Sequence, residues 1–128
     1  MLQDSVAFSG FTVKSLDEAN DFYSNVLGLK VEDTGMGLRV HLGGSHQVFI
    51  YQKDTQVPAD YTILNFPVDD IDAAVDALDA KGVTFERYAD LPGAQDEKGV
   101  LRGKQAGYGP DIAWFKDPSG NILSVLSD

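Results

Sequence analysis

The residues of this sequence that could take part in chemistry lie in two short stretches. His41 and His46 are the only histidines, and Arg39 precedes them in the same segment. Trp114, the only tryptophan, and Ser124 lie near the end of the chain. An imidazole can act as acid, base or metal ligand, a guanidinium binds anions, and an indole ring offers a surface for stacking. These residue types favour ligand binding or acid–base chemistry.

Trp114 and Ser124 are positioned by a predicted hairpin. The runs 112–116 and 122–126 have the length of strands, and Asp117-Pro118-Ser119-Gly120-Asn121 between them has the composition of a tight turn. Trp114 is either a core residue or a platform for a ligand. Ser124 is either a tolerated small residue or part of a cavity wall.

The first half of the chain reads as one strand, one helix and three strands. Residues 6–13 form the opening strand, and Ser15-Leu16-Asp17-Glu18 has the form of a capping box at the start of a helix. An apolar stripe continues to Leu27, and Gly28 ends the helix. Strands follow at 29–33, 38–42 and 47–52.

The second half repeats this pattern after a polar linker at 53–60. Five residues recur at a constant offset of 55, namely Phe11, Val13, Leu16, Asp17 and Ala19 as Phe66, Val68, Ile71, Asp72 and Ala74. Asp70 is the predicted cap of the second helix, and 83–88 mirrors the strand at 29–33. We therefore predict a single α+β domain over 1–128, made of two βαβββ modules at about 5–52 and 61–127. A long loop at 89–110 precedes the closing hairpin.

Composition excludes several classes of function. The net charge of −10 argues against nucleic acid as a partner, and the absence of cysteine excludes disulfides and thiolate sites. Neither G-x-S-x-G nor a phosphate-binding loop motif is present. Since no apolar stretch has the length of a membrane span and the N-terminus lacks a signal-peptide pattern, we expect a cytoplasmic protein without membrane contact.

Taken together, Phe22-Tyr23 followed by Leu27-Gly28, the strand end Val68-Asp69-Asp70 and the turn 117–121 resemble the vicinal oxygen chelate superfamily. This group contains glyoxalase I, extradiol dioxygenases, fosfomycin-resistance enzymes and bleomycin-resistance proteins. The resemblance implies that the two modules curl into a cup and that the chain forms a homodimer.

Catalytic members of that superfamily hold a divalent metal through His and Glu side chains. The resemblance carries the four ligand places to Phe8, Ile50, Ile63 and Ser124. Three of these side chains have no lone pair, and a neutral serine is a poor ligand. We therefore expect no metal and no cofactor.

Strand alternation predicts which side chains line the cup. If Leu42 pairs with Gln47, then Arg39 lies opposite Ile50 and His41 opposite Val48, and these four face inward without a carboxylate partner for His41. The other inward residues are Phe8, Gly10, Thr12, Ile63, Asn65, Trp114 and Ser124, and Tyr108, Asp96, Glu97 and Lys98 could reach the ligand from the long loop. An inward Arg39 must pair either with an acid or with an anionic ligand.

The leading hypothesis is a metal-free protein that binds a small aromatic antibiotic or metabolite, without catalytic residues. The alternative is a glyoxalase-like lyase or isomerase, or a dioxygenase-like enzyme, with a misplaced metal site or acid–base work by His41 and Glu97. The acidic surface favours a cationic ligand, whereas Arg39 favours a planar ligand with a carboxylate or phenolate that stacks on Trp114. We expect the local contact with Arg39 to prevail.

Overall fold

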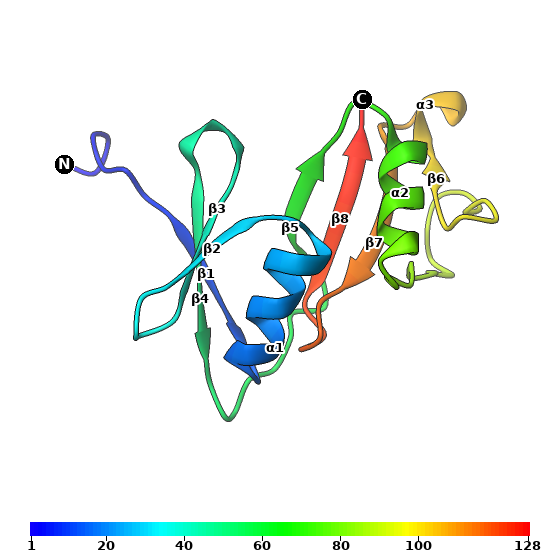
Figure 1. The fold of residues 1–128 in the computed structure, drawn as a ribbon. Coiled ribbons are helices and arrows are strands. Elements are labelled where there is room, and N and C mark those ends of the chain that lie inside the picture. The colour runs from blue at the N-terminus through cyan, green and yellow to red at the C-terminus, as the bar shows by residue number, and fades with distance from the viewer. The chain divides into compact units, whose positions relative to one another are not determined.

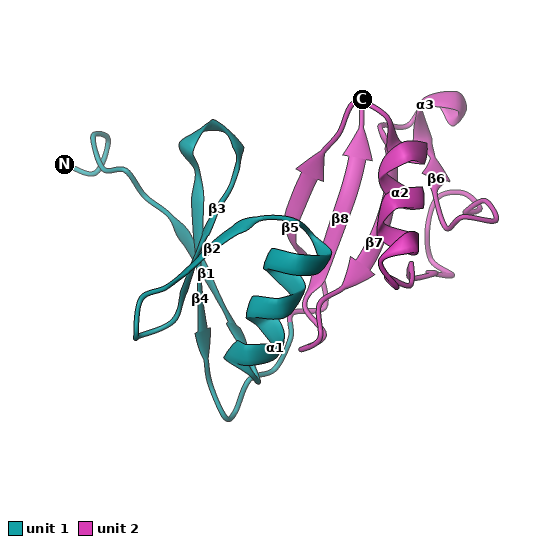
Figure 2. Cartoon of the chain, viewed as in Figure 1, with its two compact units in different colours: residues 1–58 teal, residues 59–128 magenta.

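The computed structural model describes residues 1–128, which divide into two compact units at 1–58 and 59–128 (Figure 2). Each unit has one four-stranded mixed sheet and the order strand, helix, then three strands, so the predicted α+β class is confirmed. None of the helices is long and apolar enough to cross a membrane. Each unit is described by itself below.

Unit 1 begins with β1 (Ser9–Val13), which leads into α1 (Leu16–Asp21) and a π-helical turn η1 (Phe22–Val26) (Figure 1). The remaining elements are β2 (Lys30–Asp33), β3 (Leu38–His41), a short 3-10 turn η2 (Gly43–Ser45) and β4 (Gln47–Gln52). The strand order is β1-β4-β3-β2, with β1 parallel to β4 and the other pairs antiparallel.

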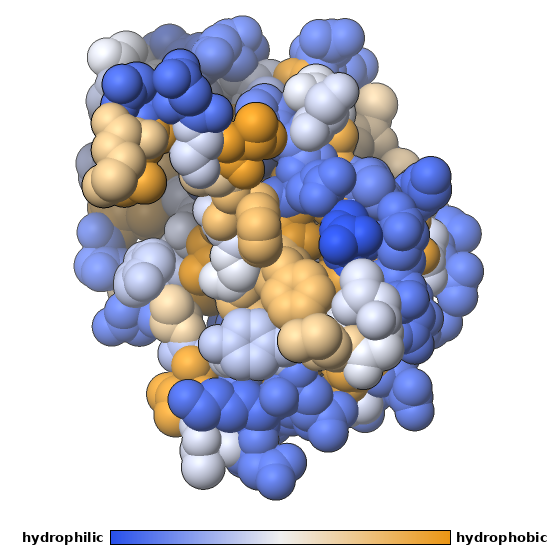
Figure 3. All heavy atoms as spheres, turned by 90° about the vertical axis from the view of Figure 1, so that its left-hand side faces the viewer, coloured by the Kyte–Doolittle hydropathy of each residue, from blue (hydrophilic) through white to orange (hydrophobic).

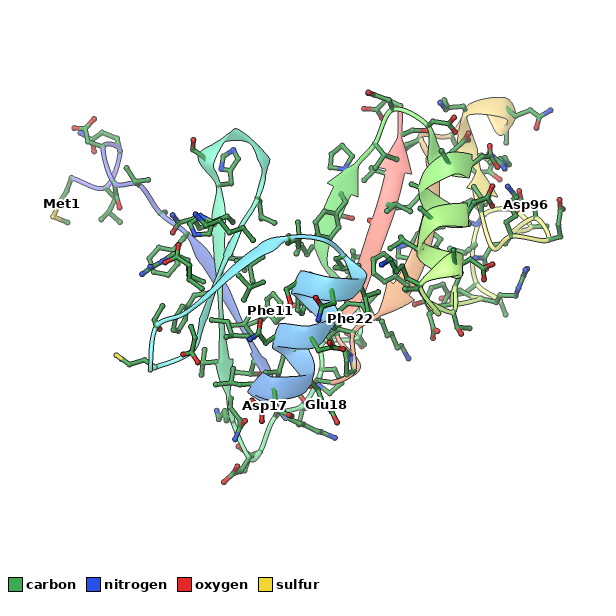
Figure 4. The ribbon with its side chains drawn as sticks, viewed as in Figure 1. Met1, Phe11, Asp17, Glu18, Phe22 and Asp96 are labelled. Carbon is green, nitrogen blue, oxygen red and sulfur yellow. The ribbon has the colours of Figure 1, made fainter.

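The helix of unit 1 begins as the capping box predicts, because the Ser15 hydroxyl accepts a hydrogen bond of 3.2 Å from the backbone N–H of Glu18. Glu18 lies at the N-terminal end of α1 (Figure 4). Tyr23 is buried, and its ring lies 6.0 Å from the ring of Phe11 on β1. Since Phe11 pairs with Ile50, the helix covers the sheet face that carries Ile50.

The register of the β3–β4 hairpin differs from the prediction by one residue. Leu38 pairs with Ile50 and His41 with Gln47, because the turn uses three residues, 43–45, and the Leu42 N–H bonds the carbonyl of His46. A shift of one residue moves every side chain of a strand to the opposite face.

The predicted inward positions of Val48 and Ile50 are therefore wrong. Both are buried on the helix-covered face, at 3% and 0% exposure, together with Leu38 and Val40. The opposite, open face of this sheet carries Arg39 and His41 of β3 and Phe49 and Tyr51 of β4.

Unit 2 repeats the topology of unit 1. It contains β5 (Thr62–Pro67), α2 (Ile71–Ala80), β6 (Leu101–Arg102), α3 (Gly103–Ala106), β7 (Asp111–Lys116) and β8 (Ile122–Ser127) (Figure 1). The order β5-β8-β7-β6, with β5 parallel to β8, matches that of unit 1, as the sequence repeat predicts. Asp70 caps α2 as expected by accepting a bond of 3.1 Å from the Ala73 N–H.

The strand predicted at 83–88 is reduced to a single bridge. Phe85 pairs with Phe115, and the Glu86 N–H bonds the Trp114 carbonyl, but the rest of the β7 edge is taken by β6. The Gln95 side chain explains this arrangement, since it bonds the Tyr88 N–H and the Glu86 carbonyl at 2.9 Å each. The long loop thus takes up the backbone groups that a continuous strand would use.

The β7–β8 turn is held by one carboxylate. Asp117 is 4% exposed, and its Oδ1 accepts the N–H groups of Ser119 and Asn121 at 2.9 Å each. The Asn121 amide bonds the other oxygen at 2.9 Å, and Gly120 has a φ of 85° that suits glycine. This turn fixes Trp114 opposite Ser124.

Candidate functional site

The sequence-predicted residues fall into two groups, one on the open sheet face of each unit. In unit 1 these are Arg39 and His41 of β3, with Phe8 just before β1. In unit 2 they are Asn65, Trp114 and Ser124. Each group is a candidate contact surface in its own right.

Arg39 borders a small hollow of about 80 Å³ on unit 1. The hollow is also lined by Phe8, Gln47 and Phe49, and by Val48, which lies between the last two in β4 and turns its side chain to the other face. Phe8 is 68% exposed, and the Phe49 and Tyr51 rings stack with their centroids 6.2 Å apart and their planes at 24°. An aromatic surface with a guanidinium at its side suits a flat ligand that carries a negative group.

Unit 1 also carries exposed apolar side chains outside its strands. Three of its large apolar side chains, Val6, Phe8 and Met36, are 93%, 68% and 83% exposed. Figure 3 shows apolar side chains set among hydrophilic ones on one face of the molecule.

Glu32 on β2 supplies the acid that sequence reasoning did not find. It pairs with Arg39 in the β2–β3 ladder, and its carboxylate Oε1 contacts His41 Nε2 while Oε2 lies 3.7 Å from Arg39 Nη1. The hydrogen bond with His41 holds the pKa of Glu32 below its ordinary value, and the nearby charges of His41 and Arg39 add to this effect. The prediction that His41 lacks a carboxylate partner is wrong, because it considered only the β3–β4 pairing.

In unit 2, Asn65, Ser124 and Trp114 form a row across three adjacent strands. Ser124 pairs with Asn65 on β5 and with Trp114 on β7. Its side chain is fully buried, and the hydroxyl donates a short hydrogen bond of 2.6 Å to Asn65 Oδ1. Ser124 is therefore committed to a neighbouring strand.

Trp114 is fixed by two contacts that sequence reasoning did not name. Its indole N–H donates to the Thr62 hydroxyl at 3.1 Å, and the Tyr88 ring meets it edge-on with the centroids 5.6 Å apart. Ile63 falls at an irregularity of the β5–β8 register between Thr62 and Leu64, so the alternation that predicts its direction is interrupted there. With its N–H satisfied, Trp114 can offer a ligand its ring but not a donor.

Tyr88 has a hydroxyl that is shielded from solvent and makes no hydrogen bond. Burial raises the pKa of this phenol, and the negative charge of Glu86 adds to the effect. The hydroxyl is therefore neutral at physiological pH.

The four places that the resemblance assigns to metal ligands do not fit a metal ion. Ile50 is buried in the core, Phe8 and Ile63 have no donor atom, and the Ser124 hydroxyl bonds Asn65. No group of three or more histidine, aspartate or glutamate side chains is close enough together to hold a metal, and His41 with Glu32 makes only a pair. A zinc centre needs more protein ligands than this pair supplies.

The predicted contact residues of the long loop make contacts within the loop and beside α2. The Tyr108 side chain is 46% exposed, and its hydroxyl packs so closely on Gly93 that an added Cβ there would lie 1.9 Å from it. Glu97 and Lys98 line a hollow of about 450 Å³ beside α2. The Lys98 ammonium lies 3.0 Å from Asp76 on α2.

Asp96, seen near α2 and β6 in Figure 4, belongs to an ionic cluster that holds the loop. Arg102 lies 2.9 Å from Asp96, 2.8 Å from Asp72 on α2 and 3.7 Å from Asp111 on β7. Hydrogen bonds from Arg102, and then from Lys98, lower the pKa of Asp72 to about 2. The cluster therefore ties three segments of unit 2 together.

Comparison with known proteins gives one family. The model of the Glyoxalase/Bleomycin resistance protein/Dioxygenase superfamily matches residues 4–125. No curated protein sequence matches the chain.

Several solved structures share the fold. An integron cassette protein from the mobile metagenome of a Halifax Harbour sewage outfall has a TM-score of 0.70 at 18% identity, with 96% of this chain and 99% of that one covered. The fosfomycin resistance protein FosX from Listeria monocytogenes has a TM-score of 0.70 at 13% identity, covering 98% and 93%. A glyoxalase family protein from Enterococcus faecalis has a TM-score of 0.66 at 20% identity, covering 98% and 99%. At these identities the likeness shows the fold alone.

Proposed function

The chain belongs to the glyoxalase/bleomycin resistance protein/dioxygenase superfamily, and we propose that it binds a small aromatic molecule without a metal ion and without catalysis. We further propose that it works as a cytoplasmic homodimer. Sequestration of an antibiotic or a metabolite is the biological role that fits such a protein, and structural neighbours named as fosfomycin resistance proteins support an antibiotic as the ligand.

The observation that carries the proposal is the bond between Ser124 and Asn65. Ser124 stands where the resemblance implies a glutamate ligand, and its buried hydroxyl is used to join β8 to β5. A position that links two strands in this way supports a structural role for this row, with Trp114 beside it. The exposed aromatic rings on the open face of unit 1, Phe8 and Tyr51, then provide binding energy.

The alternative is an enzyme that uses His41 and Glu32 as an acid–base pair. The contact between His41 Nε2 and Glu32 Oε1 favours it, because a carboxylate that holds an imidazole can orient it for proton transfer. Glu97, the partner considered from the sequence, lies in unit 2 beside the hollow at α2. A metal-dependent lyase, isomerase or dioxygenase would need ligands outside the four places tested.

The binding proposal is tested by calorimetric titration with three probes that share one ring system. Naphthoate is anionic, naphthamide is neutral and naphthylmethylammonium is cationic. Saturable binding of at least one probe, with one site per chain and no chemical change of the probe, supports the proposal. If none of the three binds at millimolar concentration, or if the probe is converted, the proposal is wrong.

A further inference from the structure

Four charged or titratable side chains gather on the open face of unit 1. Lys30 pairs with His41 and Glu32 with Arg39 in the β2–β3 ladder, so all four project from the same face. Three of them are cationic or can become so, and Glu32 is the only acid among them. In a chain with a net charge of −10, this is a local reversal of sign.

Glu32 holds the position that an anionic ligand group would need. One carboxylate oxygen contacts His41, and the other lies 3.7 Å from Arg39. The distance to Arg39 is longer than a hydrogen bond, so the guanidinium keeps donors for a second carboxylate. Arg39 and Glu32 are each 43% exposed and His41 is 28% exposed, so a ligand can reach all three.

We propose that Arg39 and His41 form a subsite for the anionic group of the ligand, and that Glu32 occupies this subsite until the ligand displaces it. The inference rests on the proposed binding function and names its ligand class, an aromatic carboxylate or an anion of similar shape. The hollow beside Arg39 supports it, because Phe8 and Phe49 line that hollow and offer rings to the aromatic part.

The test compares naphthoate with naphthamide in the wild-type chain and three variants. Arg39→Ala should lower the affinity for naphthoate about tenfold, which corresponds to the lower end of the free energy of a charge-assisted hydrogen bond. It should leave the affinity for naphthamide almost unchanged. Glu32→Gln should raise the affinity for naphthoate roughly two- to fivefold, which corresponds to the free energy of an exposed ion pair. Glu18→Gln removes the same charge from α1, on the other face of the sheet, and should have no effect.

The outcomes separate this inference from the binding proposal. If naphthamide and naphthoate bind equally well, or if Glu32→Gln weakens naphthoate, the subsite is wrong although the binding function stands. If Glu18→Gln strengthens naphthoate as much as Glu32→Gln does, the effect comes from overall charge and the displacement of Glu32 is wrong. If none of the three probes, naphthoate, naphthamide and naphthylmethylammonium, binds to the chain, both proposals are wrong.

Discussion

Ser124 and Asn65 lie side by side on the parallel strands β8 and β5, and the Ser124 hydroxyl donates a hydrogen bond of 2.6 Å to Asn65 Oδ1. We predict that Ser124→Ala lowers the free energy of unfolding by about 1 kcal/mol, the net value of one such bond. Thermal unfolding followed by circular dichroism measures the change. Ser5→Ala, at an exposed position, is the control. An unchanged melting temperature in Ser124→Ala would mean that this bond does not hold the two strands together.

Trp114 is predicted to act through its ring, because Thr62 already accepts its indole N–H. Trp114→Phe should therefore retain most of the affinity for a naphthalene probe that stacks on this ring. Trp114→Leu should lower this affinity roughly two- to tenfold, since an aromatic pair contributes about 0.5–1.5 kcal/mol beyond the burial of its area. Calorimetric titration gives both values. Equal affinity of Trp114→Leu and the wild-type chain would exclude Trp114 as a platform.

The cluster around Arg102 should make stability depend on pH in the acid range. Asp72 has its pKa lowered from 3.8 to about 2, so its contribution is complete above about pH 4 and is lost as the pH falls towards 2. Arg102→Gln should therefore lower the free energy of unfolding at neutral pH. It should also reduce the loss of stability that occurs as the pH falls from about 4 to 2. Denaturant unfolding at a series of pH values measures both effects.

A matched control for this prediction is Arg87→Gln. The Arg87 guanidinium donates hydrogen bonds to the backbone carbonyls of Asp96 and Glu97, at 2.9 and 2.8 Å. Its loss should lower stability by a similar amount at each pH. If Arg102→Gln behaves in the same way as Arg87→Gln, the ion pair with Asp72 is not the origin of the acid sensitivity.

The features that were predicted correctly from the sequence, the helix caps, the repeat and the closing turn, are those that depend on residues close together in the chain. Ser15 and Asp70 cap helices as expected, and the repeat of Phe11 to Ala19 as Phe66 to Ala74 correctly indicated two units of equal topology. Turn chemistry around Asp117 gave the closing hairpin for the same reason.

Prediction from the sequence was wrong where a shift of one residue in the strand register decides which face of the sheet a side chain occupies. A turn of three residues instead of four placed Ile50 in the core and Phe49 on the open face. Glu32 was missed because the contact with His41 depends on the pairing of β2 with β3, which no short motif specifies. Similarly, the Thr62 hydroxyl reaches Trp114 only through an irregular β5–β8 register.

Metal independence is the central claim, and one titration tests it most directly. The chain is purified without chelator and titrated with its best naphthalene probe in three buffers, one with excess EDTA, one with zinc and one with manganese. We predict the same affinity in all three, because the four places compared with metal ligands offer no carboxylate or imidazole. Binding that disappears in EDTA and returns with either metal would contradict the account.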